Sequence, residues 1–459
     1  MYDMKVKDIV AATGGTLVWG DGETPVTHID TDSRKITPGA LFVPIDGETF
    51  DGHSFIAAAF EGGAVASLTH KDTDTIVGKA VIKVDDTFKA LADIARYYRK
   101  KFSIPSVAIT GSVGKTTTKD MIAAVLSVKK EVLKTQGNFN NEIGLPLTVF
   151  NLEPKHEMMV LEMGMSGFGE IEKLSSIGMP DVAVITNIGM SHIEKLGSQE
   201  GILKAKLEIL THLSEDGIAV LNGDDKLLWG MKGKIKNAMY YACDNKEADI
   251  TAYDVENFGQ DGISFKTEID AAEYTVKVNT PGIHNVYNAL AAICVARHYN
   301  YDMCDIIKGI DAFVPSAMRM NIEKFGTITV INDCYNASPA SMSAGLDVLK
   351  DIKAGKRAAI LGDMLEMGDF AKEAHYNVGK KVFENGIDLL LTAGENAKYI
   401  AQGALDAGMD KANVKSYAKT RQLAEEVQNL IDCDFAVLVK ASRGMNFEQI
   451  TKKIGEKAV

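Results

Sequence analysis

The sequence is poor in cysteine and has no long apolar run. Its five cysteines are scattered over 459 residues without a Cys-x-x-Cys pair, which is typical of reduced thiols and argues against a disulfide framework. No stretch approaches the ~18 apolar residues that a membrane-spanning helix needs. The N-terminal residues lack the apolar core of a signal peptide. We therefore expect a cytoplasmic protein that does not insert into a membrane.

Basic residues are also in deficit, since 50 lysines and arginines face 62 acidic residues for a net charge of −12. This balance argues against a nucleic-acid partner. It does not exclude an anionic substrate, because a glycine-rich loop supplies local positive potential whatever the total charge. The length exceeds what one core supports, so we expect several domains.

One segment has the composition of a phosphate-binding loop between a predicted strand, 107–110, and a predicted helix, 115–128. It comprises Thr110, Gly111, Ser112, Val113, Gly114, Lys115, Thr116 and Thr117. The glycines let backbone N–H groups converge on phosphate oxygens at a helix N-terminus. Lys115 can neutralise terminal phosphates, and Thr116 can ligate Mg²⁺. Ile109 replaces the first glycine of the full Walker pattern, so this is a variant loop. It predicts binding of a nucleoside triphosphate.

Runs of apolar residues divide the chain into parts 1–86, 87–313 and 314–459. The first part has short strand-like runs around one helix and predicts a small α/β domain, with strands at 26–29, 41–45, 64–68 and 80–84 and the helix at 54–60. In the other two parts strands alternate with longer helices, which predicts parallel βαβ units. Their predicted strands are 158–163, 182–187, 218–222, 327–332, 357–361, 387–392 and 435–440.

Polar residues that close apolar strands are the first candidates for a site, because ligands of parallel sheets gather at the carboxyl ends of strands. Glu162, Asn187 and the segment 222–225 occupy such positions, and His192 follows Asn187. A carboxylate beside a loop threonine suits Mg²⁺, so Glu162 is the preferred metal ligand. A helix-capping role for Glu162 and a structural role for His192 are the alternatives.

Lys206 is out of place in the predicted helix 199–213. It projects from the middle of an apolar stripe, whereas Lys204 points to the opposite side. Burial would lower the pKa of Lys206 and favour the neutral amine. Such an amine can pair with a carboxylate, contact a phosphate or react with CO₂ to give an anionic carbamate. A lysine at the helix edge with its amine in solvent is the alternative.

Two later segments offer further polar groups. Asn285 and Asn288 lie three apart at the start of a helix of small residues, where their amides can hold a base or ribose. N-capping is the alternative for Asn285. Asp333 ends a strand in the third part, and Arg319 lies in the region before it. Both are candidates for reaching a bound nucleotide across a cleft.

Taken together, these motifs resemble, in order, those of the Mur ligases over nearly the whole chain. They are 110–117, Glu162, His192, Ala205-Lys206, His284–Asn288, Arg319 and Asn332-Asp333. Three further segments, 137–147, 361–368 and 439–445, resemble the family members that add D-alanyl-D-alanine. Ala441, where a glycine is expected, and Ala317 depart from the pattern without touching the central motifs.

The resemblance implies three domains: 1–86 for the UDP-sugar, 87–313 for ATP and two Mg²⁺ ions, and 314–459 as a Rossmann-like domain. It implies that Thr116 and Glu162 ligate one Mg²⁺, and that His192 and a carbamylated Lys206 hold the second. Nucleotide contacts would come from the loop residues with Asn285, Asn288, Arg319 and Asp333. Substrate contacts would come from Asp32, Ser33, Arg34, Asn138, Asn141 and Asn336.

The implied reaction joins D-alanyl-D-alanine to UDP-N-acetylmuramoyl-tripeptide and forms the pentapeptide precursor of peptidoglycan. ATP would phosphorylate the tripeptide carboxylate to an acyl phosphate, which the dipeptide amine then attacks. Charge neutralisation by Lys115 and two metals suits phosphoryl transfer without a covalent enzyme intermediate. We expect a monomer.

Several other functions are weighed against this one. The family's diaminopimelate- or lysine-adding ligases are expected to carry an Asp-Asn-Pro-Arg motif, which this sequence lacks. The folate-polyglutamate ligases do not share the Asn-Asn-Glu-Ile-Gly-Leu-Pro run at 140–146. An ATP-driven switch protein and a small-molecule kinase are alternatives from other classes, and neither would require an amine substrate.

Overall fold

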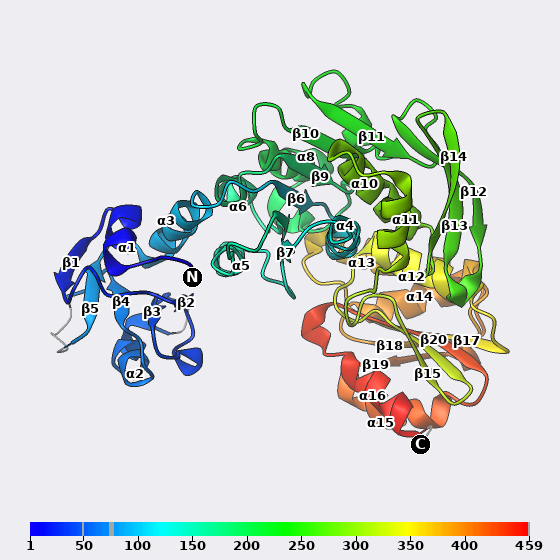
Figure 1. The fold of residues 1–459 in the computed structure, drawn as a ribbon. Coiled ribbons are helices and arrows are strands. Elements are labelled where there is room, and N and C mark those ends of the chain that lie inside the picture. The colour runs from blue at the N-terminus through cyan, green and yellow to red at the C-terminus, as the bar shows by residue number, and fades with distance from the viewer. Residues whose placement is uncertain (48–49, 73–77, 458–459) are drawn as a thin grey trace. The chain divides into compact units, whose positions relative to one another are not determined.

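The computed structural model describes residues 1–47, 50–72 and 78–457 (Figure 1). Its strands form three sheets, of five, nine and six strands. The chain divides into two compact units. The first comprises Met1–Ile109, Lys129–Ala183 and Leu207–Gly217, and the second comprises Thr110–Val128, Val184–Lys206 and Ile218–Val459. No helix within the described ranges is both long enough and apolar enough to cross a membrane.

The five-stranded sheet has the order β1-β5-β4-β3-β2, parallel except for β1. Its core packs α2 against strand residues such as Phe42 and Val81. Asp86 begins the following helix, α3, by accepting hydrogen bonds from the backbone N–H groups of Phe88 and Lys89. The elements are α1 (Val6–Thr13), β1 (Thr16–Trp19), β2 (His28–Asp30), η1 (Ser33–Lys35), β3 (Ala40–Phe42), η2 (Gly52–Phe55), α2 (Ile56–Glu61), β4 (Ala66–Thr69), β5 (Ala80–Lys83) and α3 (Thr87–Arg99).

The nine-stranded sheet has the order β14-β13-β12-β11-β10-β9-β6-β8-β7. Strands β6, β7 and β8 pair in parallel, as do β10, β11 and β12. Strands β12, β13 and β14 are antiparallel. The elements are β6 (Ser106–Thr110), α4 (Lys115–Leu126), β7 (Val132–Lys134), α5 (Gly144–Val149), β8 (Met158–Glu162), α6 (Glu170–Gly178), β9 (Val182–Ile185), α7 (Ile193–Leu196), α8 (Gln199–Leu207), η3 (Glu208–Leu210), β10 (Ile218–Asn222), α9 (Lys226–Trp229), β11 (Ala238–Ala242), β12 (Ile250–Asn257), η4 (Gly259–Asp261), β13 (Ile263–Ile269), β14 (Ala272–Val278), α10 (His284–His298) and α11 (Met303–Asp311).

The six-stranded sheet has the order β15-β16-β20-β17-β18-β19, parallel except for β15. Helices α12, α13 and α14 cover one face and α15 and α16 the other, as in a Rossmann-like fold (Figure 1). The elements are β15 (Asn321–Phe325), β16 (Ile328–Asn332), α12 (Pro339–Asp351), β17 (Lys356–Gly362), η5 (Gly368–Phe370), α13 (Ala371–Glu384), β18 (Leu389–Ala393), α14 (Ala397–Ala407), η6 (Lys411–Asn413), β19 (Val414–Tyr417), α15 (Thr420–Leu430), β20 (Phe435–Lys440), η7 (Arg443–Met445) and α16 (Glu448–Lys457).

The α/β class and the predicted strands are confirmed, with ends shifted by a few residues. Three expectations were wrong. The central part is not purely parallel, because β12, β13 and β14 (250–278) form an antiparallel meander. Polar and apolar residues alternate along these strands, as in an antiparallel sheet that is buried on one face. The helix predicted at 199–213 ends at Leu207 and continues as the 3₁₀ turn η3. The helix predicted at 54–60 is the 3₁₀ turn η2 followed by α2.

Helices α13 and α14 make their contact through glycines. A Cβ atom on Gly379 would lie 2.0 Å from the carbonyl oxygen of Ile400, and one on Gly403 would lie 2.0 Å from the carbonyl oxygen of Tyr376. Both separations are far below van der Waals contact. The two backbones therefore approach more closely than any residue with a side chain allows.

We expect Gly379→Ala to destabilise the protein by about 1–3 kcal/mol, because the helices must separate. This loss outweighs the gain of up to about 1 kcal/mol in helix propensity. Urea unfolding of the purified protein measures it. Glu384→Ala, at an exposed position on the same helix, is the control and should change stability by less than about 0.5 kcal/mol. Equal stability of the Gly379 variant and the control would contradict the packing argument.

Candidate active site

The phosphate-binding loop joins β6 to α4 with the backbone that its glycines were expected to provide. Gly114 precedes the helix with φ +86°, and Gly111 has φ +151°. A Cβ atom on Gly111 would lie 1.9 Å from Thr186 Oγ1. Only glycine therefore fits at position 111. Thr116, in the first turn of α4, is 3% exposed, and Thr117 is half-buried.

The segment after β9 holds this loop in place. Val113 N–H donates to Asn187 Oδ1 at 3.0 Å, and the Val113 carbonyl accepts from Thr186 Oγ1 at 2.6 Å and from Asn187 Nδ2 at 2.9 Å. Ser112 Oγ accepts from the Gly189 N–H at 2.8 Å. Asn187, singled out only as a polar strand end, thus clamps the loop through both backbone polar groups of Val113.

Lys206 is buried, as the periodicity of its helix predicted. It is 2% exposed, whereas Lys204 on the same helix is exposed, so the helix-edge alternative was wrong. Burial, and secondly the positive charge of Lys115, hold the pKa of Lys206 well below its usual range. Lys115 belongs to the same unit, and its Nζ donates to the Gly111 carbonyl at 2.8 Å. The site favours a neutral, nucleophilic amine at Lys206.

Asn285 and Asn288 lie at the start of α10, which packs against α4. Asn285 does not cap the helix, because its Nδ2 donates to the Pro281 carbonyl at 2.8 Å and its Oδ1 accepts from Asn288 Nδ2 at 3.0 Å. Asn288 Oδ1 accepts from Thr118 Oγ1 at 2.8 Å. A Cβ on Gly114 would lie 3.3 Å from Asn288 Oδ1. This amide chain therefore connects α10 to the loop helix; the predicted nucleotide contacts of both asparagines stay predictions.

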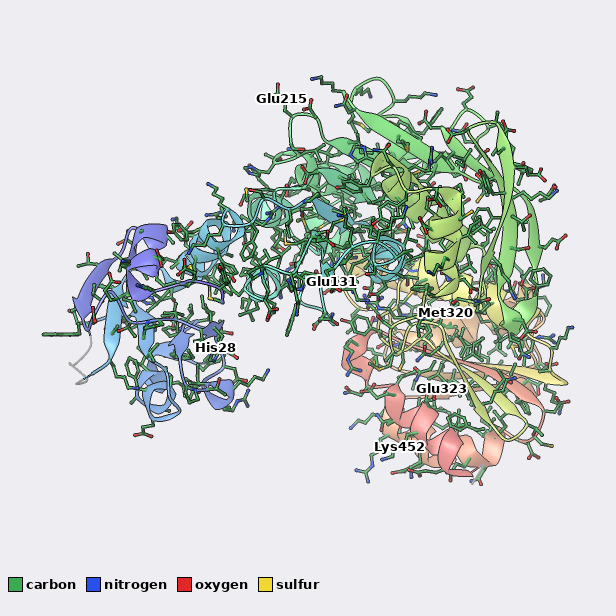
Figure 2. The ribbon with its side chains drawn as sticks, viewed as in Figure 1. His28, Glu131, Glu215, Met320, Glu323 and Lys452 are labelled. Carbon is green, nitrogen blue, oxygen red and sulfur yellow. The ribbon has the colours of Figure 1, made fainter. Side chains whose placement is uncertain are left out.

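Asp333 follows β16 and forms an ion pair with Lys440, the last residue of β20. Lys440 is 2% exposed, and its Nζ also donates to the Asn336 carbonyl at 3.0 Å. Asp333 Oδ1 accepts from the N–H of Met320, labelled in Figure 2, at 3.1 Å. The sequence analysis did not single out Lys440. The signal that could have identified it is its position as a lysine at the end of the apolar strand β20.

Arg319 lies beside this cluster with its guanidinium 4.0 Å from the centre of the Tyr335 ring. His284 is affected by the cluster's charges: burial lowers its pKa to about 4, with Asp333 acting to raise it and Lys440 to lower it. A neutral imidazole therefore lies at the start of α10.

The side chains of His192 and Glu366 make a close contact that the sequence did not predict. His192 Nδ1 lies 2.6 Å from Glu366 Oε2, and this hydrogen bond lowers the pKa of the Glu366 carboxyl. Both residues have positive φ, +63° and +62°. Glu366 lies in the 361–368 segment, whose resemblance to relatives was noted without assigning it a role. The structural alternative for His192 is thus supported in part, since its imidazole makes a specific hydrogen bond.

Glu162 ends β8 opposite Ile109 of β6 and is 1% exposed. One of its oxygens accepts from Asn140 Nδ2 at 2.8 Å. In the same unit, Asn141 Oδ1 accepts from the N–H groups of Gly144 and Ile143 at the start of α5. The Asn138 carbonyl accepts from the Asn140 N–H at 2.7 Å. Pairing of Glu162 with Thr116 in a metal site stays a prediction, as do the substrate contacts of Asn138, Asn141 and Asn336.

Asp32, Ser33 and Arg34 form the start of η1 in the five-stranded domain. Asp32 Oδ1 accepts from the Arg34 N–H at 3.1 Å, and both carboxylate oxygens accept from the Arg34 guanidinium at 2.8 Å. The Arg34 side chain is exposed. Their role in binding a UDP-sugar stays a prediction.

The same domain holds Asp46, His53 and His70 close enough to share a metal ion. Lys71 Nζ already lies 3.6 Å from Asp46 and 2.7 Å from Asp51, while His53 Nε2 accepts from the His70 N–H. Lys71 thus places a positive charge next to the only carboxylate of the three, Asp46, which disfavours a cation there.

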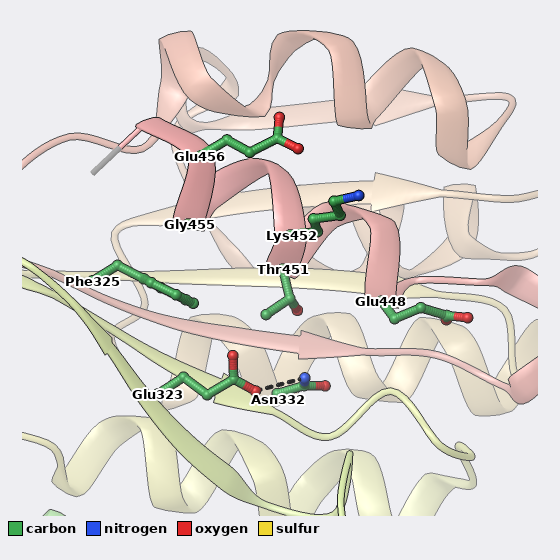
Figure 3. Close-up of a pocket in the computed structure, with 8 residues that line it drawn as sticks. All are labelled: Glu323, Phe325, Asn332, Glu448, Thr451, Lys452, Gly455 and Glu456. Atoms are coloured by element: carbon green, nitrogen blue, oxygen red, sulfur yellow. Dashed lines mark hydrogen bonds between the residues drawn. The ribbon is translucent and has the colours of Figure 1, made fainter. Parts of the chain in front are cut away.

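A pocket of about 490 Å³ lies between α16 and strands β15 and β16 (Figure 3). Asn332 Nδ2 donates to Glu323 Oε1 at 2.9 Å within it. None of the predicted site residues lines this pocket, so it is not the candidate active site.

We expect Gly111→Ala to weaken ATP binding by roughly tenfold or more, because a Cβ there displaces Thr186 or the loop at a cost of ~1–3 kcal/mol. Fluorescence titration with a labelled ATP analogue measures the change, and thermal unfolding checks the fold. Gly233→Ala is the control, since Gly233 also has positive φ but its Cβ would meet nothing within 4 Å. Unchanged nucleotide affinity in the Gly111 variant would contradict the assignment of this loop.

Comparison with known proteins gives three matching sequence families along the chain. They are described as "Mur ligase family, catalytic domain" over residues 25–99, "Mur ligase middle domain" over 109–296 and "Mur ligase, glutamate ligase domain" over 318–443.

Full-length relatives and solved structures agree with these matches. A UDP-N-acetylmuramoyl-tripeptide–D-alanyl-D-alanine ligase of Bacillus subtilis is 41% identical over 99% of both chains, and one of Escherichia coli is 33% identical over 93% of both. The crystal structure of MurF from Acinetobacter baumannii superposes with a TM-score of 0.91 at 29% identity over 99% of each chain. MurF from Thermotoga maritima in complex with ADP gives 0.83 at 29% identity, covering 95% of this chain and 98% of that one. With its phosphate loop, buried lysine and three sheets, the chain belongs to the Mur ligase family.

Proposed function

We propose that the protein is an ATP-dependent, ADP-forming ligase that joins D-alanyl-D-alanine to UDP-N-acetylmuramoyl-tripeptide. The observation that carries the proposal is the buried Lys206 amine, whose pKa is lowered by burial and by the positive charge of Lys115 of the phosphate loop; a simple nucleotide switch does not need such a lysine. Relatives named for this reaction match from end to end, one of them at 41% identity. The product is the pentapeptide precursor of peptidoglycan.

The loop residues orient the triphosphate for transfer to the tripeptide carboxylate. Backbone N–H groups at the start of α4 and the Lys115 ammonium bind the phosphates and stabilise the charge that spreads over the transferred group, while the N–H groups of Ser112 and Val113 donate to Asn187 and fix the loop. The carboxylate oxygen attacks the γ-phosphorus, ADP leaves, and an acyl phosphate forms. The dipeptide amine then attacks the acyl carbon, expels phosphate and loses a proton to form the amide. Ser112 and Val113 take no covalent part: Val113 has no nucleophilic side chain, and the Ser112 hydroxyl is held by the Gly189 N–H as part of the loop structure.

Two Mg²⁺ sites complete the proposal, with Thr116 and Glu162 holding one ion and His192 and Lys206 the other. Bound Mg²⁺ would neutralise phosphate charge and polarise the reacting oxygens. The donor set fits this use: Glu162 is a buried carboxylate, and His192 has one imidazole nitrogen turned to Glu366 and the other left for a ligand.

Lys206 fits as a ligand only in carbamylated form, because a cation would repel the metal. The neutral amine attacks CO₂, forms an N–C bond and releases a proton, which converts the side chain to an anionic carbamate. The lowered pKa of Lys206 supplies the neutral amine at a pH where an exposed lysine is charged.

The remaining parts of the proposal concern domain use and assembly. Domain 1–86 binds the UDP-sugar through Asp32, Ser33 and Arg34, domain 87–313 binds ATP, and domain 314–459 receives the dipeptide and contacts the nucleotide through Arg319 and Asp333. The proposed boundary at 313–314 falls in the connection between α11 and β15. The enzyme acts as a monomer in the cytoplasm, where ATP is available.

Phosphate release from Mg-ATP with UDP-N-acetylmuramoyl-tripeptide, with and without D-alanyl-D-alanine, tests the reaction. We expect release to require both substrates and the product to be heavier than the tripeptide substrate by the dipeptide less one water. Phosphate release that does not depend on either substrate would overturn the proposal and would indicate an ATP-driven switch. A phosphorylated product that is stable without an amine would indicate a kinase.

Lys206→Met should lower the ligation rate by roughly 100-fold or more, the upper range for loss of a metal-site group. Thermal stability should hold or rise, because a buried ionisable group is replaced by an apolar one of similar length. Wild-type activity should fall when CO₂ is stripped from the buffer and recover with bicarbonate.

The exposed Lys204→Met on the same helix is the matched control and should keep wild-type rates. A Lys206→Met enzyme that ligates normally would exclude a role for the amine. Wild-type activity that is insensitive to CO₂ would exclude the carbamate while leaving the ligase reaction intact.

A further inference from the structure

A close contact between the side chains of His192 and Glu366 joins two segments far apart in the chain. His192 precedes α7, in the segment matched by the middle-domain family, and Glu366 lies in the loop between β17 and η5, in the segment matched by the glutamate-ligase-domain family. Both residues belong to the same compact unit. Their side chains meet at 2.6 Å, which is the distance of a strong charge-assisted hydrogen bond.

Backbone geometry distinguishes this contact from an ordinary surface ion pair. His192 and Glu366 have φ of +63° and +62°, a region that costs energy for residues with a side chain and that clusters at functional sites. The loops around them are also close, since a Cβ on Gly368 would lie 3.1 Å from Glu194 Cγ. Both residues of this contact therefore adopt an unfavourable backbone conformation, in which the imidazole of His192 meets the carboxylate of Glu366.

The hydrogen bond fixes which nitrogen of His192 is available. When the neutral imidazole donates its Nδ1 proton to Glu366, which lies 2.6 Å away, Nε2 carries the lone pair. Nε2 has no hydrogen bond to any residue in the described part of the chain. Histidines that ligate metals characteristically donate their other N–H to a carboxylate, which sets the tautomer, fixes the ring and raises the ligand's basicity.

We propose that Glu366 is a positioning residue that holds His192 in the tautomer and orientation in which Nε2 ligates a divalent cation. The inference rests on the proposed function for the identity of that cation's site. According to this inference, metal binding requires Glu366 of the C-terminal segment in addition to the ligands themselves. Cation affinity at His192 therefore depends on the 361–368 loop meeting the 192–196 segment, so the domain that receives the dipeptide also tunes the metal.

Mn²⁺, a paramagnetic substitute for Mg²⁺, provides a readout that does not depend on turnover. With saturating ADP, wild-type protein should show electron–nuclear coupling between Mn²⁺ and a histidine nitrogen, and His192→Ala should abolish it. Glu366→Gln should weaken this histidine-linked Mn²⁺ binding by roughly 10- to 100-fold while leaving ADP affinity unchanged. Glu366→Gln combined with His192→Ala should bind Mn²⁺ no more weakly than His192→Ala alone, because Glu366 acts only through the imidazole.

Glu373→Gln, at an exposed position in the first turn of α13, is the matched control and should bind Mn²⁺ as wild type does. Wild-type Mn²⁺ affinity in Glu366→Gln, additive losses in the double variant, or no histidine coupling in the wild type would each overturn the inference. Failure of the ligase proposal is seen separately, as phosphate release that ignores the dipeptide. The Mn²⁺ titration reports on Glu366 in either case.

Discussion

The fixed backbone of residues 111–114 is the constraint on which the rest of the site depends. Gly111 lies against the Thr186 hydroxyl with no room for a side chain, and Asn187 bonds to both polar atoms of Val113. The loop backbone is therefore fixed without help from a ligand, with the Ser112 and Val113 N–H groups donating to Asn187. Little reorganisation then opposes the binding of phosphate, which is the condition for strong electrostatic stabilisation.

Around this loop the protein places two lysines in different surroundings. The Lys115 Nζ donates to the Gly111 carbonyl, whereas burial, and secondly the charge of Lys115, drive Lys206 toward the neutral amine. The proposed mechanism uses this pair as a positive group for ATP and as the source of an anionic carbamate for a metal. Two side chains of one type thus acquire different chemistry from their surroundings alone.

The C-terminal sheet contributes by bringing polar groups of distant segments together. Lys440 closes β20 and holds Asp333 and Asn336, while Glu366 extends from the loop after β17 to His192. Each of these groups lies at the carboxyl end of a strand, where a parallel sheet collects its ligands.

The sequence by itself determined the phosphate loop, the α/β class, the inward direction of Lys206 and the family. These depend on short-range patterns: glycine spacing, strand and helix periods, and a lysine within an apolar stripe. It did not determine the antiparallel meander at 250–278, the clamp of Asn187 on Val113 or the partners of Lys440. Only the tertiary structure decided that Glu366 meets His192. The reason is that such contacts depend on how distant segments pack, and no local period encodes which exposed carboxylate a folded chain will bring to a given imidazole.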